Sequence, residues 1–342
     1  MFGARYVSQN KAKDVMPDIV AFGEVMVRLA PPHFQRLEQA RSLDLEIGGA
    51  ELNTAAGLVR LGRSAAWVSR LPDNALGKLV ANRVREIGVS DQFVQFAEDG
   101  RCGLYFLEFG ASPRASSILY DRKDSSVARA HRGMFDWSAI FRGAKWFHVS
   151  GIAAALSPGA AEVVDEAMHA ARDAGVKVCM DLNYRSKLWA KDHAAEVMGI
   201  LLPQVDALIA SEADAEHLFG ITGADFTEVA EGLVEKFGVS TVVGTRREAS
   251  LVWRNRFAAV GYSAGQTYES AWYEVEIVDR LGAGDALAAG LIHGLIDGDL
   301  KKGLDYGAAM GALKHTVPGD LPWLTKDEVE AAMQGQGLRI KR

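Results

Sequence analysis

The chain has 342 residues, of which 49% are hydrophobic and 24% charged, a composition typical of a globular protein with a large buried core. Its formal net charge of −6 argues against nucleic acid or an anionic membrane as a partner, because no basic field would attract either one. No uninterrupted apolar run reaches the ~20 residues that a membrane-spanning helix needs.

The ends and the cysteines indicate the compartment. Residues 1–17 lack the apolar stretch of a secretory signal and are predicted to be a flexible tail, as is the segment 331–342. Cys102 and Cys179 have no CxxC spacing, so we expect a reduced, cytoplasmic protein without structural zinc.

Between the two tails, apolar runs rich in β-branched residues alternate with helical patterns. Strands are predicted at 18–29, 65–71, 145–151, 176–183, 207–212, 240–245 and 272–279, and helices at 50–62, 74–88, 160–175 and 286–295. This alternation predicts one α/β domain, residues 18–330, with a parallel sheet covered by helices.

Two segments, 33–47 and 97–125, break the alternation. Both contain period-two stretches, and turn residues such as GASPRAS (110–116) stand between them. We expect short antiparallel strands that form a lid over a site. The alternative is an extension at the edge of the main sheet.

The stretch LGAGD, residues 281–285, lies between a predicted strand and a predicted helix. Its glycines allow a tight turn that gathers N–H groups at a helix N-terminus, which suits an anion such as phosphate. Asp285 could then take a proton from an attacking hydroxyl, while the N–H groups of Ala283, Gly284 and Asp285 hold the transferred group. The alternative is a helix N-cap, for which aspartate is also suited.

Two stretches in the chain resemble the signatures of one family. DRLGAGD (279–285) with its small-residue helix resembles the C-terminal signature of the ribokinase-like (PfkB) carbohydrate kinases. GGAELNTAAGLVRLG (48–62) resembles their N-terminal signature, and the resemblance extends from about residue 18 to about residue 325. Within the family, ILYDRKDSS (118–126), MDLNYRSKLW (180–189) and HTVPGD (315–320) are similar to the 2-keto-3-deoxygluconate kinases, as is FGEVMVRLAPP (22–32).

The resemblance implies a ribokinase-like, Rossmann-type three-layer α/β sandwich with a small β-sheet lid. In relatives this lid often builds a dimer, so a homo-oligomer is expected. The implied substrates are ATP, with Mg²⁺, and a small sugar acid.

The resemblance also implies roles for individual residues. Asp285 would be the catalytic base, and Gly282, Ala283 and Gly284 the anion hole. The residues implied to hold the sugar acid are Gly49, Asn53, Tyr105, Tyr120, Arg122, Arg185 and Asp320. Those implied to contact the nucleotide are Asn183, Thr245, Arg247 and Arg280, together with Gly282 and Gly284.

The arginines carry the substrate assignment independently. A sugar acid has a carboxylate, and the planar guanidinium of arginine suits that group better than any other side chain does. Arg122 follows an aromatic residue on a predicted lid strand, and Arg185 follows Tyr184 just past a predicted core strand. A neutral sugar would need neither arginine. The alternative is that both are ordinary surface arginines.

Three positions depart from the family pattern. Arg280 replaces the usual threonine of the C-terminal signature, and the nucleotide-side loop, 242–255, carries arginines where small residues are usual. The element NxxE, which in the family helps to recruit magnesium, is represented by Ser211 and Asp214. Asp214 is kept as a candidate for holding the metal through water.

The expected reaction is transfer of the γ-phosphate of ATP to the terminal (6-) hydroxyl of 2-keto-3-deoxygluconate. One alternative is a kinase for a neutral sugar, of the fructokinase or ribokinase type. The other is a catalytically weak sugar-binding relative that has kept the fold.

Overall fold

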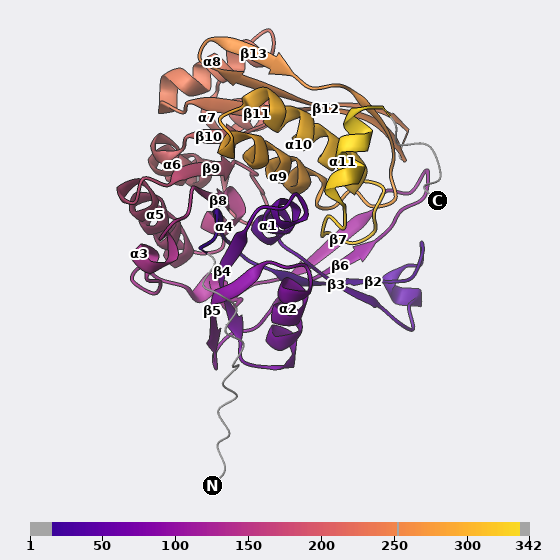
Figure 1. The fold of residues 1–342 in the computed structure, drawn as a ribbon. Helices are drawn as coiled ribbons and strands as arrows, with labels where there is room; N and C mark the ends of the chain where they lie inside the picture. The colour runs from indigo at the N-terminus through magenta and orange to yellow at the C-terminus, as the bar shows by residue number, and fades with distance from the viewer. Residues whose placement is uncertain (1–15, 252, 336–342) are drawn as a thin grey trace.

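The computed structural model describes residues 16–251 and 253–335, which form a large sheet, a small sheet and the helices around them (Figure 1). The strands of the large sheet are β1 (Ile19–Phe22), β4 (Ala65–Pro72), β5 (Ser90–Ala97), β8 (Trp146–Ser150), β9 (Lys177–Asp181), β10 (Ala207–Ile209), β11 (Thr241–Leu251), β12 (Arg254–Ser263), β13 (Gln266–Glu269) and β14 (Tyr273–Glu276). Their order is β13-β12-β11-β10-β9-β8-β1-β4-β5, and β14 pairs with β12. The strands from β11 to β5 are parallel, as predicted, whereas β12, β13 and β14 are antiparallel additions.

Helices cover both faces of the large sheet. One face carries α1 (Ala50–Arg60), α2 (Ala75–Glu86), α9 (Ala283–Ile296), α10 (Leu300–Lys314) and α11 (Lys326–Met333). The other carries α3 (Trp137–Ile140), α4 (Gly151–Ala155), α5 (Pro158–Asp173), α6 (Lys191–Leu201), α7 (Glu212–Phe219) and α8 (Phe226–Phe237).

Each face of the large sheet has its own hydrophobic core beneath its helices, and β1 contributes side chains to both. Ile19 and Ala21 pack in the core beneath α1 and α9, whereas Val20 and Phe22 pack in the core beneath α3 to α8, and all four are fully buried. Because successive side chains of a strand point to opposite faces, a strand buried on both sides must be apolar throughout. The expected three-layer α/β sandwich is confirmed.

The small sheet has the order β3-β2-β6-β7 and projects beside the C-terminal helices in Figure 1. Its strands are β2 (Met26–Ala30), β3 (Asp44–Gly48), β6 (Gly103–Glu108) and β7 (Ser117–Asp121). It is a sheet of its own, so the alternative of an edge extension is wrong. The pairs β2–β3 and β6–β7 are antiparallel, as expected, but β2 and β6 are parallel.

Three sequence expectations need correction. The segment 18–29 is not one strand, because the chain leaves the large sheet at Gly23, where an added Cβ would lie 2.0 Å from Glu51 Oε2. Within 33–47 only β3 is a strand, and the residues before it form a loop with a short 3-10 turn, Leu37–Gln39. The segment 242–255 is not a loop but most of the β11–β12 hairpin.

The sequence also predicts two terminal tails and no membrane-spanning helix. Helix α11 continues past residue 330, the predicted end of the domain, and the predicted tails otherwise fall largely on residues 1–15 and 336–342, outside the described residues. Within the described ranges, none of the helices combines the length and the apolar character needed to cross a bilayer.

Candidate active site

The turn before α9 is shaped for an anion. Gly282 precedes the helix with φ of 83°, and an added Cβ would lie 2.1 Å from the carbonyl oxygen of Asp320, so only glycine fits. Nothing lies within 4 Å of the position that a Cβ on Gly284 would occupy, so the chain leaves this side of the turn open. The first N–H groups of the 14-residue helix have no partner within the helix, although Ala283 N donates to the Arg280 carbonyl oxygen at 3.4 Å.

Asp285 lies in the first turn of α9 and is held from α1. Asn53 Nδ2 donates to Asp285 Oδ2 at 2.7 Å, and Thr54 Oγ1 donates to the Asp285 carbonyl oxygen at 3.2 Å. The N-cap of α9 is Gly282 and Asp285 is the third residue of the helix, so the alternative that Asp285 is the N-cap is wrong. Loss of hydration outweighs the Asn53 hydrogen bond and raises the pKa of Asp285 to about 6, although the residue keeps part of its solvent access. A carboxylate with this pKa is suited to general base catalysis near neutral pH.

A cleft of about 1150 Å³ lies between the small sheet, the start of α1 and the loop after β9. Four residues predicted to hold the sugar line it together, namely Gly49, Tyr120, Arg122 and Arg185. Tyr105, Asn53 and Asp320 are not among the residues lining this cleft. The cleft therefore unites two family-like stretches, 118–126 and 180–189, that are far apart in the sequence.

Arg122 is already engaged by a residue that the sequence analysis missed. Arg122 Nε donates to Glu24 Oε2 at 2.8 Å, and Nη2 forms a short ion pair with the same oxygen. Glu24 is buried, so most of the charge of the arginine is neutralised inside the protein. Among the described residues, none accepts a hydrogen bond from Arg122 Nη1. No spacing rule could have found this pair, because Glu24 and Arg122 are 98 positions apart.

Arg185 differs from Arg122 in its environment. It is exposed, and within the described part of the chain its guanidinium forms no hydrogen bond or ion pair. Its positive charge partly offsets the rise in the pKa of both Asp181 and Asp285, so its charge reaches both carboxyls. Lys187 lies on the same loop, with its Nζ 5.9 Å from the centre of the Tyr120 ring. The loop after β9 thus places two cations at the cleft.

Two further carboxyls lie near Asp285 and were not predicted. Glu51 is buried and accepts hydrogen bonds from Ser150 Oγ at 2.5 Å and from Ser150 N at 3.0 Å. Burial, with repulsion from Asp285, raises the pKa of Glu51 to about 7, and the same two causes raise that of Asp181 to about 7. The position of Asp181 at the carboxyl end of a central parallel strand was the signal available in the sequence.

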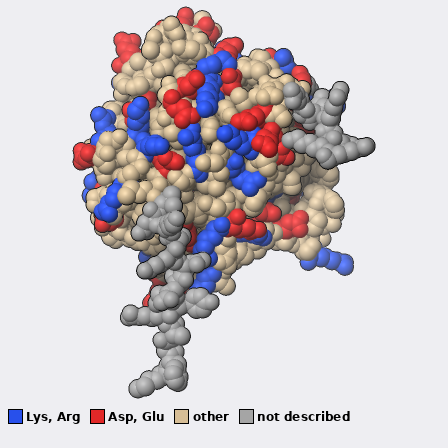
Figure 2. Space-filling model, viewed as in Figure 1, with Lys and Arg blue, Asp and Glu red and all other residues tan. Residues whose placement is uncertain are grey.

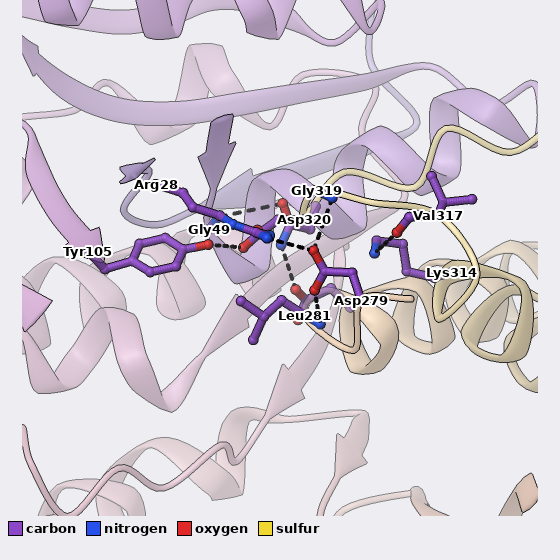
Figure 3. Close-up of polar contacts among 11 residues, drawn as sticks. Arg28, Gly49, Tyr105, Asp279, Leu281, Lys314, Val317, Gly319 and Asp320 are labelled. Atoms are coloured by element: carbon purple, nitrogen blue, oxygen red, sulfur yellow. Dashed lines mark hydrogen bonds and ion pairs between the residues drawn. The ribbon is translucent and has the colours of Figure 1, made fainter. Parts of the chain in front are cut away.

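Tyr105 and Asp320 belong to a buried polar cluster beneath the turn (Figure 3). Tyr105 OH donates to Asp320 Oδ2 at 2.6 Å, and Arg28 Nη1 donates to Asp320 Oδ1 at 2.8 Å. Arg28 Nη2 also lies 2.7 Å from Asp279 Oδ2, and the other oxygen of Asp279 accepts from Leu281 N at 3.1 Å. The polar groups of Tyr105 and Asp320 are thus engaged with protein partners, although both residues were predicted to hold sugar.

The residues predicted to contact the nucleotide lie on three segments. Asn183 has φ of 37° and donates from Nδ2 to Asp181 Oδ2 at 3.1 Å. Thr245 and Arg247 lie on β11, and the Arg247 guanidinium lies 5.6 Å from the centre of the Phe257 ring. Burial, and then the charge of Arg280, lower the pKa of Arg247, so these two arginines face the same region. An anionic phosphate group would relieve this repulsion.

The structure gives little support for a metal site built from protein side chains. Across residues 16–251 and 253–335, no group of three His, Cys, Asp or Glu side chains could hold a metal ion. Ser211 caps α7 by accepting from Asp214 N at 3.0 Å, and the charge of Asp214 contributes to the raised pKa of Asp181. Such a site fits Mg²⁺, which is usually held by phosphates, waters and one or two carboxylates rather than by a protein cage.

Comparison with known proteins agrees with this geometry. The chain is 40% identical to the 2-dehydro-3-deoxygalactonokinase of Haloferax volcanii over 326 residues, 95% of this chain and 99% of that protein. It is 28% identical to the 5-dehydro-2-deoxygluconokinase of Bacillus subtilis over 328 residues, 93% of this chain and 96% of that protein. The crystal structure of the 2-dehydro-3-deoxygluconokinase of Thermotoga maritima superposes with a TM-score of 0.89 at 40% identity, covering 93% of this chain and 98% of that one. Residues 16–325 match the family described as pfkB family carbohydrate kinase, and the chain belongs to this family of ATP-dependent sugar kinases.

Proposed function

We propose that the protein transfers the γ-phosphoryl group of ATP to the 6-hydroxyl of a 2-keto-3-deoxy sugar acid, with 2-keto-3-deoxygluconate as the substrate. The observation that carries the proposal is Arg185, an exposed guanidinium without a protein partner among the described residues, in a cleft that also contains Lys187. A carboxylate that leaves water for a closed site needs donors with positive charge. A neutral sugar would leave both cations unpaired. The galactonate epimer is a second candidate, because the relative from Haloferax volcanii carries that name.

Each step of the reaction is assigned to residues of this chain. Asp285 Oδ1 or Oδ2 takes the proton of the 6-hydroxyl as its oxygen attacks the γ-phosphorus, and the bond from the phosphorus to the ADP oxygen breaks. The N–H groups of Ala283, Gly284 and Asp285 hold the charge on the transferred group. Arg247 and Arg280 bind the nucleotide phosphates, together with Asn183 and Thr245. Asp214 would hold a water of a Mg²⁺ ion bound with ATP, and that ion would neutralise charge on the phosphates.

The roles of the sugar-binding residues follow from their contacts. Arg185 pairs with the substrate carboxylate, because its guanidinium is not engaged by the described residues. Arg122 keeps its ion pair with Glu24 and offers only Nη1 to the sugar. Gly49 and Tyr120 line the cleft and complete the contacts, whereas Asn53 acts by holding Asp285. Tyr105 and Asp320 act by shaping the base of the site, since each already satisfies the other.

The test is the ratio of kcat/KM for 2-keto-3-deoxygluconate to that for fructose in a coupled kinase assay. The wild type should favour the acid, and Arg185→Met should lower the ratio by about 10- to 100-fold, chiefly through KM. Arg132→Met is the matched control, because Arg132 is an exposed arginine paired with Asp165 on α5. A wild type that prefers fructose would refute the sugar-acid assignment and favour the neutral-sugar alternative. Absence of turnover with every acceptor would favour the sugar-binding alternative.

We also propose a cytoplasmic location, a small-molecule substrate and a homo-oligomeric state. Both cysteines are buried and free, and burial raises the pKa of the Cys102 thiol to about 11, which fits a reducing cytoplasm. Figure 2 shows basic and acidic side chains interspersed on one face of the molecule, which fits a small-molecule substrate rather than nucleic acid. We expect a homo-oligomer, and light scattering after size-exclusion chromatography would measure it.

A further inference from the structure

A lysine lies buried beneath the anion-binding turn. Lys314 is the last residue of α10, and none of its surface is exposed to solvent. Its Nζ donates to the carbonyl oxygen of Val317 at 2.9 Å, and the described residues provide no direct ion pair for it (Figure 3). A buried ammonium is costly unless its charge is used, so its position calls for a physical explanation.

The lysine packs directly against the turn. Lys314 Cε lies 3.3 Å from the position that a Cβ on Gly282 would occupy. The position of a Cβ on Gly284, two residues further along the same turn, is open. The side chain of Lys314 therefore supports the turn from within the protein, next to the position that is open.

The nearby carboxylates do not neutralise Lys314 by direct contact, so its charge can act on the site. Arg28 contacts Asp279 at 2.7 Å and Asp320 at 2.8 Å, so both carboxylates already have a direct cationic partner. Burial lowers the pKa of Lys314 and the charge of Arg28 adds to this effect, whereas Asp279, Asp320 and Asp285 favour the charged form. The lysine in turn helps to lower the pKa of Asp285. The other charged groups that face Asp285 are Asp320, Arg185, Glu51 and Asp181.

We propose that Lys314 is a positioning residue for phosphoryl transfer, whose ammonium supports the Gly282 turn and stabilises negative charge on both Asp285 and the transferred group. The inference rests on the proposed kinase reaction but not on the identity of the sugar. A fixed charge in a water-poor site acts strongly because it needs no reorganisation during the reaction. Lys314 touches neither substrate, so its effect reaches the reaction through the turn and through its electric field.

The test compares three variants by their kcat across pH. Lys314→Met removes the charge and the donor to Val317, Lys314→Gln keeps a donor but removes the charge, and Lys314→Arg keeps both. Arg63→Met is the control, because Arg63 binds the opposite end of α9 through the His293 carbonyl oxygen and Asp297. The Met and Gln variants should lose about 10-fold or more in kcat, with KM for ATP within about threefold of the wild type. The acid limb of their kcat profiles should move to higher pH, because Asp285 loses a stabilising charge.

The outcomes separate the role of the charge from a structural role. Retention of the wild-type limb and of most of the activity by Lys314→Arg and by Arg63→Met would support the proposal. Folded Met and Gln variants with wild-type kcat would overturn it, and so would a loss of kcat without movement of the acid limb. If Lys314→Met does not fold, the Gln variant decides. The assay uses whichever sugar the wild type phosphorylates, so a wrong substrate leaves the test intact, whereas an inactive wild type defeats the proposed function itself.

Discussion

Replacing Asp285 with asparagine should make the protein less active and, above about pH 6, more stable. Raising the pKa of this carboxyl from 3.8 to about 6 corresponds to about 3 kcal/mol against its ionised form, at about 1.4 kcal/mol for each pH unit. Because the residue keeps part of its solvent access, screening reduces this penalty, and we expect about 1–2 kcal/mol. Asparagine has nearly the same shape and can still accept the hydrogen bond from Asn53, but it has no charge to desolvate.

The sign of the pH dependence follows from the direction of the pKa shift. Below pH ~4 Asp285 is protonated in both folded and unfolded chains, so the carboxyl carries no penalty. As pH rises from ~4 to ~6, the unfolded chain ionises first and the folded protein loses stability. The advantage of Asp285→Asn should therefore grow over this window and stay constant above it. Urea denaturation of both proteins at pH 4.5 and pH 8 would measure this.

Activity should change in the opposite direction. Loss of the general base should lower kcat by about 10²- to 10⁴-fold while the sugar still binds. Asp285→Ala is the control, because it removes the base but also leaves Asn53 without its partner, and it should gain less stability or none. Near wild-type turnover in folded Asp285→Asn would refute the role as base. A lower free energy of unfolding at pH 8 would refute the reasoning from burial.

Three further predictions follow from the same contacts. The kcat of the wild type should fall as pH decreases through about 6, because protonated Asp285 cannot take a proton, and a flat profile from pH 5 to 8 would contradict this. Arg28→Met should lower the free energy of unfolding by about 3–5 kcal/mol in urea denaturation, because Asp279 and Asp320 would be left buried without their direct partner; a loss below ~1 kcal/mol would contradict this. Hydrogen exchange in β6 and β7 should slow when sugar and nucleotide bind, if the small sheet closes over the cleft that β7 lines, and unchanged exchange at saturation would count against a lid.

The sequence by itself determined the layers of the fold and the glycine turn that we propose to be catalytic. Alternating strand and helix patterns predict a parallel sheet covered on both faces, because each pattern reflects local periodicity and burial. The turn at 281–285 could also be recognised, because glycine freedom, the helix N-terminus and Asp285 are encoded within a few adjacent residues. Both family signatures are also encoded in adjacent residues, and the N-terminal one includes Asn53, which donates to Asp285.

Only the tertiary structure decided which charges are available to a substrate. The sequence does not distinguish Arg122 from Arg185, because each is an arginine in a family-like stretch. In the structure, Arg122 is paired with buried Glu24, whereas Arg185 is exposed in the cleft. Arg28 reaches Asp320 across 292 positions, and buried Lys314 supports a turn formed by a different segment. The division of 18–29 between two sheets is of the same kind, since Gly23 marks it only because Glu51 of α1 occupies the adjacent space. Such contacts depend on how separate elements pack, and a pairing between distant side chains leaves no periodic trace in either segment.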